Sequence, residues 1–294
     1  MKLAIPEPSP GARSLAGAAG FLLDLLLAGL LVFALVDRLA PPQDLPWKPF
    51  SLDQPIGLAT AGKLARIGAD PAACRAALRE GGVRFMEGET RETGFCSTRN
   101  TVRAAGRLAP AAPVMTCPLA LDYALWERQV LAPAARDILH SRLTRVDHYG
   151  TYACRTIYGR PGERPSAHAR AAALDVAGFR FADGRRATVA ADFGADSAKG
   201  RFVRAARNGA CRVFGTILGP DYNAAHRDHF HLEEGGWNKC SWLRTSWRPR
   251  PAGRRRRPSL GGNPSARGPG GPRPSSDGRW RYSGSCRRRD PRTR

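Results

Sequence analysis

The sequence predicts an α+β domain in which helices pack against a mostly antiparallel sheet. Apolar residues recur at helical spacing over residues 118–139, whereas runs such as Thr144–His148 and Phe230–Leu232 have the length and composition of strands. Between two further apolar runs lies Ala182-Asp183-Gly184-Arg185, which is typical of a hairpin turn. Helices interspersed with short, turn-linked strands make the predicted class α+β.

Each element is predicted from its own local pattern. Helices are expected over residues 57–79, 118–139 and 197–214, where apolar residues share one face. Thr116 is a candidate N-cap of the second helix, and Pro133 is expected to kink or restart it. Residues 80–110 are rich in Gly and Arg and are expected to form small strands and loops. Further strands are expected over residues 144–148, 151–154, 171–179, 187–193 and 230–232.

An apolar stretch near the amino end, residues 15–36, is long enough to cross a bilayer. As a helix it would span about 33 Å. Lys2 and Arg13 precede it, which favours an internal amino terminus. Asp24 lies near its middle, where a carboxylate costs about 2.5–3.5 kcal/mol. We interpret the stretch as an uncleaved signal anchor in the inner membrane, with the main domain periplasmic or otherwise extracytoplasmic; a cleaved signal and a buried helix are the alternatives.

The positive charge of the chain is concentrated at its carboxyl end. The net charge is +22, and residues 248–294 contain 15 Arg, no Lys and two Asp, a charge of +13. Arg, Pro, Gly and Ser dominate this segment, which is expected to be disordered because it cannot bury enough apolar surface to fold. It could contact polyanions by charge alone, without a specific nucleic acid as partner, or have no defined partner.

These patterns divide the chain into six parts. Residues 37–56 are rich in Pro and polar groups, as a stalk from a membrane would be. Residues 57–110 are expected to pack as a lead-in subdomain rather than to fold independently. The parts are an amino-terminal cytoplasmic segment (1–14), a transmembrane signal anchor (15–36), a linker (37–56), the lead-in subdomain (57–110), the main domain (111–247) and the disordered tail (248–294).

The use of cysteine indicates an oxidising compartment. Six cysteines are dispersed through the folded part, and none belongs to a Cys-x-x-Cys pair, which disfavours a zinc knuckle or a redox motif. Behind an export segment, six such residues suggest three disulfides, and 15 pairings are possible. Our preferred pairs are Cys154–Cys211 and Cys117–Cys240, which would brace the candidate site from both sides; scattered buried thiols are the alternative.

Residue types that bind metals gather in two short motifs. The first runs from Ser166 to Asp175 and includes His168, and the second is His226-Arg227-Asp228-His229-Phe230-His231. A catalytic zinc site needs about three ligands from His, Asp, Glu or Cys, with one position left open for water. If the motifs meet in space, they form a hydrolase site or the relic of one. The alternative is that they are surface or core histidines.

Strand alternation brings the candidate ligands to one face. In the second motif it places His229, His231 and Glu233 on one face and the intervening apolar residues on the other. In the first motif Asp175 shares a face with small alanines that leave room for an ion or a substrate, and His168 lies in the turn before the strand. The apolar face would then pack on the core and direct the imidazoles into a cleft.

The sequence resembles the bacterial extensin-like carboxy-terminal domain family over roughly residues 45–240. The matching pieces are Cys117-Pro118-Leu119, Gly150–Arg155, Ser166-x-His168 with Asp175, Gly209–Arg212 and, longest of all, Gly219–His231. More distantly, the pattern Ser-x-His…Asp…His-x-His is similar to zinc peptidases grouped with lysostaphin, D-alanyl-D-alanine carboxypeptidases and hedgehog domains. This resemblance implies a zinc-peptidase-like fold and a Zn²⁺ held by His168, Asp175 and His231.

The resemblance leaves two candidates for the catalytic base. Asp228 stands where the carboxypeptidases have a Glu, and His229 stands where the murein endopeptidases have a His. We favour His229 because it shares the strand face of His231, while the other group would orient a ligand. Arg155 is implied to bind a substrate carboxylate or carbonyl; the alternative is an ordinary surface or salt-bridged arginine. Ser166 is interpreted as a turn or cap residue rather than a nucleophile.

Two functions are consistent with these residues. The first is a membrane-anchored, extracytoplasmic, zinc-dependent hydrolase of a peptide or amide bond, with peptidoglycan or a cell-wall peptide as substrate. The second is a non-catalytic cell-wall binding or envelope-organising module. It is suggested by the undefined activity of the family and by Ala167 and Arg170, which depart from the family pattern beside His168. Loss of activity on His231→Ala in a folded domain would distinguish the hydrolase.

Overall fold

The computed structural model describes residues 10–235 and 239–240, and in this part of the chain the predicted α+β class is confirmed. The larger sheet contains β3 (Leu108–Ala109), β5 (Leu143–Gly150), β6 (Ala173–Phe181), β7 (Arg186–Thr188), β8 (Thr216–Leu218), β9 (Phe230–Glu233) and β10 (Lys239–Cys240). Its order is β10-β8-β9-β6-β5-β3, and β7 pairs with β6. The pairs β3–β5 and β10–β8 are parallel and the others are antiparallel, so the sheet is mostly antiparallel.

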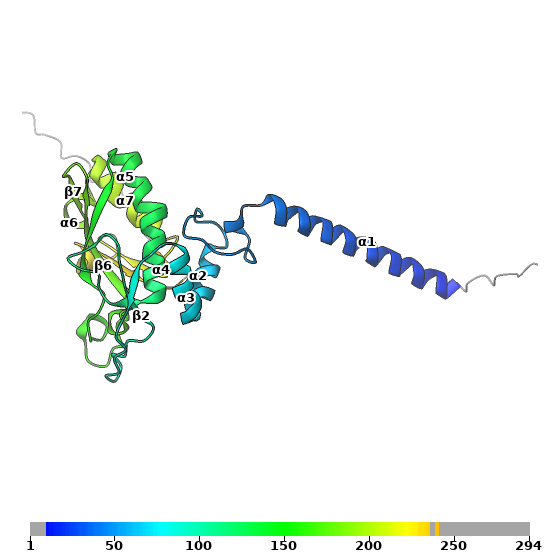
Figure 1. Ribbon diagram of the computed structural model, residues 1–294, viewed down its shortest axis with the longest axis horizontal. Helices are drawn as coiled ribbons and strands as arrows, with labels where there is room; N and C mark the ends of the chain where they lie inside the picture. The colour runs from blue at the N-terminus through cyan, green and yellow to red at the C-terminus, as the bar shows by residue number, and fades with distance from the viewer. Residues whose placement is uncertain (1–9, 236–238, 241–294) are drawn as a thin grey trace, which may run out of the picture. The chain divides into compact units, whose positions relative to one another are not determined.

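A smaller sheet and several helices complete the described part of the chain (Figure 1). The smaller sheet has the order β1 (Phe85–Glu87), β2 (Thr101–Ala104) and β4 (Met115–Thr116). The α-helices are α1 (Pro10–Leu39), α2 (Thr60–Ala69), α3 (Pro71–Glu80), α4 (Cys117–Trp126), α5 (Ala132–Leu139), α6 (Val189–Asp192) and α7 (Ala198–Ala210). A π-helical turn, η2 (Glu127–Leu131), joins α4 to α5, and short 3₁₀ turns are η1 (Pro42–Asp44), η3 (Ile157–Gly159), η4 (Ala167–Arg170) and η5 (Ala224–His226).

The hydrophobic core joins the larger sheet to α4, α5 and α7, which Figure 1 shows together beside the sheet. Trp126 of α4 is fully buried, and its ring lies edge-on to Phe179 of β6 and to Phe214, with ring centroids 6.2 and 5.8 Å apart. Its Nε1 donates to the carbonyl of Ala206 in α7 at 2.9 Å. The indole therefore fills the core while its polar hydrogen is bonded.

A β-bulge in β6 changes which side chains face the core. Ala177 has no partner on β5 and interrupts the register of the two strands. Before it, the side chains that belong to the hydrophobic core have even numbers, as at Val176; after it they have odd numbers, as at Phe179. Asp175, which precedes the bulge, therefore faces away from the apolar core. On β9 the predicted alternation likewise buries Phe230 in the core.

The helix expected over residues 57–79 is in fact two helices. Asp70 separates α2 from α3 and has an extended backbone (φ −108°, ψ 112°), the conformation that a residue before proline prefers. Its side chain caps α3 by accepting from the amides of Ala72 at 2.8 Å and Ala73 at 3.3 Å. Pro71 at the first position of α3 completes this start signal. The prediction missed the break because the apolar spacing continues across it.

The second predicted helix is confirmed, with a π turn in its middle. Thr116 caps α4 as expected by accepting from the amide of Leu119. Pro133 lies in the first turn of α5 and cannot donate to a carbonyl in the preceding turn. The chain widens just before it, where the amide of Ala132 donates to the carbonyl of Glu127. The proline is therefore accommodated within a helical segment that runs from α4 to α5.

Three of the five predicted strands are confirmed as β5, β6 and β9, and the predicted hairpin joins β6 to β7. The strand expected over residues 151–154 is wrong, since β5 ends at Gly150. The strand expected over residues 187–193 is also largely wrong. β7 ends at Thr188, whose side chain accepts from the amide of Ala191 and starts the short helix α6. A local capping bond thus overrides the β-like composition.

Both preferred disulfide pairs are wrong. Cys117 bonds to Cys74 and joins α4 to α3. Cys154 bonds to Cys96 and ties the chain after β5 to the loop before β2. Cys211 is also disulfide-bonded. The general expectation of disulfides in the folded part is confirmed. The preferred pairs are wrong because the place of a cysteine in the sequence does not show which cysteine it meets in the fold.

Residues 42–59, which we call the collar, pack on the domain instead of forming an extended stalk. Leu52 is 1% exposed, and its carbonyl accepts from Gln129 of η2 at 2.7 Å. Ile56 is buried, and its carbonyl accepts from Arg212. Lys63 of α2 is buried and donates to the Pro42 carbonyl at 2.7 Å. The Pro-rich composition therefore reflects a folded connection with few regular elements.

The amino-terminal helix α1 is long and apolar enough to cross a membrane. The candidate span is Ala18–Leu39, and its described side chains are mostly exposed. A signal sequence meets the same criteria of length and composition. Just after the span, Lys48 and the indole nitrogen of Trp47 contact Asp37 at 2.8 and 2.6 Å. The predictions made for residues 1–9 and for the Arg-rich segment 248–294 lie outside the described residues.

We predict that Leu52→Ala lowers the free energy of unfolding by about 2–5 kcal/mol, because it opens a cavity under the collar. Leu58→Ala is the matched control: the same substitution in the same segment, but at a side chain that is 90% exposed, where we expect a change of less than about 0.5 kcal/mol. Denaturant unfolding of the detergent-solubilised chain measures both. Equal, small effects would mean that the collar is detached from the domain in solution.

Candidate functional site

The two predicted motifs meet on the face of the larger sheet opposite the core. Antiparallel pairing of β6 with β9 sets Asp175 directly opposite His231. His168 lies in η4, just before β6, and is buried. Ser166 caps η4 by accepting from the amide of His168 at 3.3 Å, so its interpretation as a cap is confirmed. Ala171 ends η4 with a left-handed backbone (φ 56°), and the chain then enters β6.

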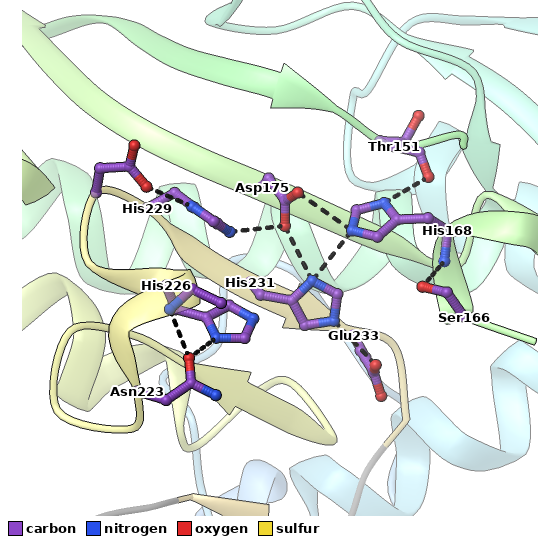
Figure 2. Close-up of polar contacts among 11 residues, drawn as sticks. Thr151, Ser166, His168, Asp175, Asn223, His226, His229, His231 and Glu233 are labelled. Carbon is purple, nitrogen blue, oxygen red and sulfur yellow. Dashed lines mark hydrogen bonds and ion pairs between the residues drawn. The ribbon is translucent and has the colours of Figure 1, made fainter. Parts of the chain in front are cut away.

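His168, Asp175 and His231 form a compact triad (Figure 2). Nε2 of His168 lies 3.1 Å from Nδ1 of His231 and 3.2 Å from one carboxylate oxygen of Asp175. The other oxygen of Asp175 lies 2.9 Å from Nδ1 of His231. One ligand atom from each residue lies within 4.8 Å of the other two.

The opposite ring nitrogens of the triad are also held. Nδ1 of His168 donates to the Thr151 carbonyl at 3.1 Å, so that Nε2 faces His231 and Asp175. Nε2 of His231 donates to Glu233 at 2.9 Å, which directs Nδ1 at Asp175. Figure 2 shows both outer contacts on the far side of each ring from Asp175. Each ring is thus held in one orientation, with Nε2 of His168 and Nδ1 of His231 facing the centre of the triad.

The carboxylates give the triad a negative potential. Burial disfavours a charge on Asp175, but hydrogen bonds from His168 and His231 outweigh it and hold the pKa of this carboxyl well below its usual range. Burial also disfavours the charged form of His231, and the contacts with Asp175 and Glu233 more than offset it, which raises the pKa of His231 to about 9. The pKa of Glu233 is lowered as well, because its hydrogen bond from His231 exceeds the cost of burial. The position between the rings favours a positive charge.

The spacing of the triad fits a tetrahedral metal ion. Ligand atoms about 2.0–2.1 Å from a zinc ion lie about 3.3 Å from one another. Nδ1 of His231 lies 3.1 Å from Nε2 of His168 and 2.9 Å from one oxygen of Asp175, while His168 contacts the other oxygen at 3.2 Å. With one ligand atom taken from each residue, the three atoms all lie within 4.8 Å of one another. The donor set of two imidazoles and one carboxylate is one that Zn²⁺ accepts. These residues could therefore hold the ion with one carboxylate oxygen of Asp175 directed at the position between the two imidazoles.

His229 lies beside the triad, and Asp228 lies behind His229. Nε2 of His229 is 3.7 Å from Asp175, and its Nδ1 contacts Asp228 at 2.9 Å. A hydrogen bond from His229 lowers the pKa of Asp228. Tyr149 of β5 lies against the other side of the ring, with ring centroids 5.7 Å apart. His229 thus directs Nε2 toward Asp175 of the triad, whereas Asp228 contacts Nδ1 on the far side of the ring.

His226 was part of the predicted motif but had no assigned role. Its ring lies 5.7 Å from the ring of His231 and 5.3 Å from the ring of His229. Burial and the neighbouring imidazoles lower the pKa of His226 to about 4. Its Nδ1 donates to Asn223 at 2.8 Å, and Tyr222 stacks edge-on at 5.8 Å. A neutral imidazole therefore forms one wall of the site.

A cavity of about 840 Å³ opens in front of these residues. Its walls include Asp175, His226, His229, His231 and Glu233, together with three exposed arginines, Arg155, Arg164 and Arg170. Of these three, only Arg155 was predicted as a site residue. No helix or strand pattern in the sequence marks Arg164 as a site residue. It lines the cavity because its loop folds back through the bridge between Thr156 and Pro165.

Arg155 and Arg164 belong to a small hairpin, residues 155–166, which we call the flap. Thr156 and Pro165 form its bridge, and the amide of Ser166 donates to the Arg155 carbonyl at 3.1 Å. Cys154, immediately before the flap, is the residue that bonds to Cys96. The disulfide therefore anchors the base of one cavity wall.

Comparison with known proteins places the chain in one family. Residues 72–241 match the family described as Extensin-like protein C-terminus. The chain belongs to this family. The matched part includes the triad, His229 and all three cavity arginines. No curated protein and no solved structure matches the chain.

The flap predicts a test by limited proteolysis. Replacing Cys96 and Cys154 by Ser frees the base of the flap, so we expect a glutamyl endopeptidase to cleave after the exposed Glu163 several-fold faster. The matched control is the double Cys→Ser variant of Cys74 and Cys117, which removes a disulfide away from the flap. Equal rates of cleavage at Glu163 in the two variants would show that the disulfide does not restrain the flap.

Proposed function

We propose that this extensin-like protein is a membrane-anchored, extracytoplasmic, zinc-dependent hydrolase of a peptide or amide bond in peptidoglycan. The coarser part of this description follows from the family and from α1, which fit a membrane-anchored envelope protein. The observation that supports the chemistry is the triad of His168, Asp175 and His231 at the base of an open cavity. The similarity of this triad to the metal sites of zinc peptidases is itself part of the proposal.

The triad would supply three metal ligands: Nε2 of His168, a carboxylate oxygen of Asp175 and Nδ1 of His231. A Zn²⁺ bound there supplies a Lewis acid that activates water and polarises a carbonyl group. The chain contributes the orientation of the ligands, because Thr151 and Glu233 fix the two rings from behind.

His229 is the best-placed general base. Asp228 accepts from its Nδ1, so that Nε2 keeps its lone pair and can take up a proton on the cavity side. Asp228 is then a positioning residue, because its contact with His229 lies behind the ring. Arg155 lines the same cavity and is placed to bind a carbonyl or carboxylate of the substrate.

An extracytoplasmic location of the domain agrees with its disulfides, which persist in oxidising compartments. With α1 as an uncleaved anchor in the inner membrane, the domain would lie in the periplasm. Peptidoglycan is the peptide-containing polymer that such a domain would meet there.

The first test is metal content. We expect the full-length chain to bind about one Zn²⁺, measured by elemental analysis after dialysis, and His168→Ala to lose it. His140→Asn is the matched control: it removes an imidazole outside the site at a left-handed position that Asn tolerates. Glu233→Ala should weaken zinc affinity about 10–100-fold, because it removes the partner of His231. A folded wild-type chain without zinc affinity would refute the metal site.

The second test is hydrolysis of purified peptidoglycan, followed by the release of new amine ends. We expect His229→Ala to lower turnover at least about 100-fold while the zinc content stays unchanged. Asp228→Ala should have a smaller effect, because it only orients the imidazole. A larger loss for Asp228→Ala than for His229→Ala would assign the base to Asp228.

The alternative function is a non-catalytic cell-wall binding or envelope-organising module. It is distinguished by the same experiment: zinc-loaded chain would bind peptidoglycan without releasing amine ends, and His231→Ala would keep that binding. Arg170 and Ala167, which depart from the family pattern next to His168, are the residues that motivate it.

A further inference from the structure

Three arginines line the cavity, and the proposed hydrolysis uses only one of them, Arg155. Arg155, Arg164 and Arg170 line it with exposed guanidinium groups. Among the described residues, no ion pair or hydrogen bond joins any of the three to a carboxylate. The acidic residues of the wall, Asp175 and Glu233, already contact the triad histidines. Three guanidinium groups thus line the cavity without an ion pair to any described carboxylate; an acidic neighbour of Arg170 is Glu234, on which its charge acts from the adjoining cavity.

Two of these arginines are held at one side of the cavity by the flap. The amide of Ile157 donates to the Arg164 carbonyl at 2.9 Å, and the amide of Ser166 donates to the Arg155 carbonyl at 3.1 Å. These bonds set Arg155 and Arg164 on facing arms of the hairpin. Because the Cys96–Cys154 disulfide anchors the base, the two side chains are presented from a restrained element.

Arg170 lies at a different place, at the end of η4 and two residues after His168. It also lines a second cavity, of about 410 Å³, together with Thr116, Ala172 and Glu234. Arg170 therefore stands where the triad cavity meets its neighbour. A ligand in the triad cavity could therefore contact guanidinium groups from two elements, the flap and η4.

Exposed guanidinium groups that line a cavity favour anionic ligands, since their fork of donors matches a carboxylate. We propose that the cavity selects a ligand with at least two carboxylates, one bound by Arg155 and Arg164 of the flap and the other by Arg170, with the amide between them over the triad. This inference rests on the proposed function for the bond that is cut, but the recognition itself needs no turnover. The substrate class is an acidic peptide segment rather than a neutral one.

The test compares two forms of one probe. Purified peptidoglycan and the same material with its carboxylates converted to methylamides are mixed with the zinc-loaded, full-length chain, and the bound fraction is measured by co-sedimentation. We expect amidation to weaken binding at least about tenfold, because charge-assisted hydrogen bonds are lost. Equal affinity of the wild-type chain for both forms would overturn the proposal, whether or not any variant folds.

Two arginine variants and a control show which residues cause the loss of binding on amidation. Arg164→Gln and Arg170→Gln should each weaken binding to native peptidoglycan by about tenfold and should have almost no further effect on the amidated form, because the partner charge is already gone. Arg201→Gln on α7 is the matched control, with the same charge change at an exposed residue outside both cavities. Equal losses on both forms would contradict direct pairing with carboxylates.

The outcomes separate this inference from the proposed hydrolase. A chain that shows the full binding pattern but releases no amine ends keeps the inference and rejects the hydrolase. A chain that cuts peptidoglycan but binds both forms equally keeps the hydrolase and rejects the inference. The tail, residues 248–294, is present in every sample, so any binding by its arginines is common to all variants.

Discussion

The pairing of β6 with β9 is the interaction on which both the core and the candidate site depend. One set of alternating side chains, which includes Val176 and Phe230, is buried against the helices. The other set places Asp175 opposite His231. A slip of one residue would bury the charged set and expose the apolar set, so hydrophobic burial itself fixes the register. The placement of Asp175 against His231 is thus set by the same force that forms the core.

The parts of the site that lie on strands could be predicted because they follow from a local pattern. Period-two alternation put His229, His231 and Glu233 on the face opposite the apolar residues, and the structure has them in one cavity wall. His168 was expected in the turn before Asp175, and it lies there in η4. Such assignments need only the sequence of a few neighbouring residues, because a strand leaves each side chain one of two directions.

The parts that could not be predicted depend on contacts between distant segments. The Thr151 carbonyl that orients His168 carries no side-chain signal, and Arg164 reaches the cavity only because the flap folds back. The disulfide partners failed for the same reason: Cys74 and Cys117 are 43 residues apart and meet through the packing of α3 on α4. The break at Asp70 is different, because it could have been predicted. Asp70 followed by Pro71 is a typical start of a helix, but the apolar spacing continues across both residues and favoured one long helix.

The packed collar changes how the domain would encounter its target. A flexible tether lets a catalytic or binding domain explore a volume that grows with linker length, and its local concentration near any one target falls accordingly. Here the residues between α1 and the domain are used in packing, with Leu52 and Ile56 buried. With α1 in a bilayer, the packed collar would therefore leave little chain to act as a tether, and the domain would search mainly by lateral diffusion along the membrane. Such a protein meets the material nearest the membrane first, and lateral diffusion in the lipid sets the rate of encounter.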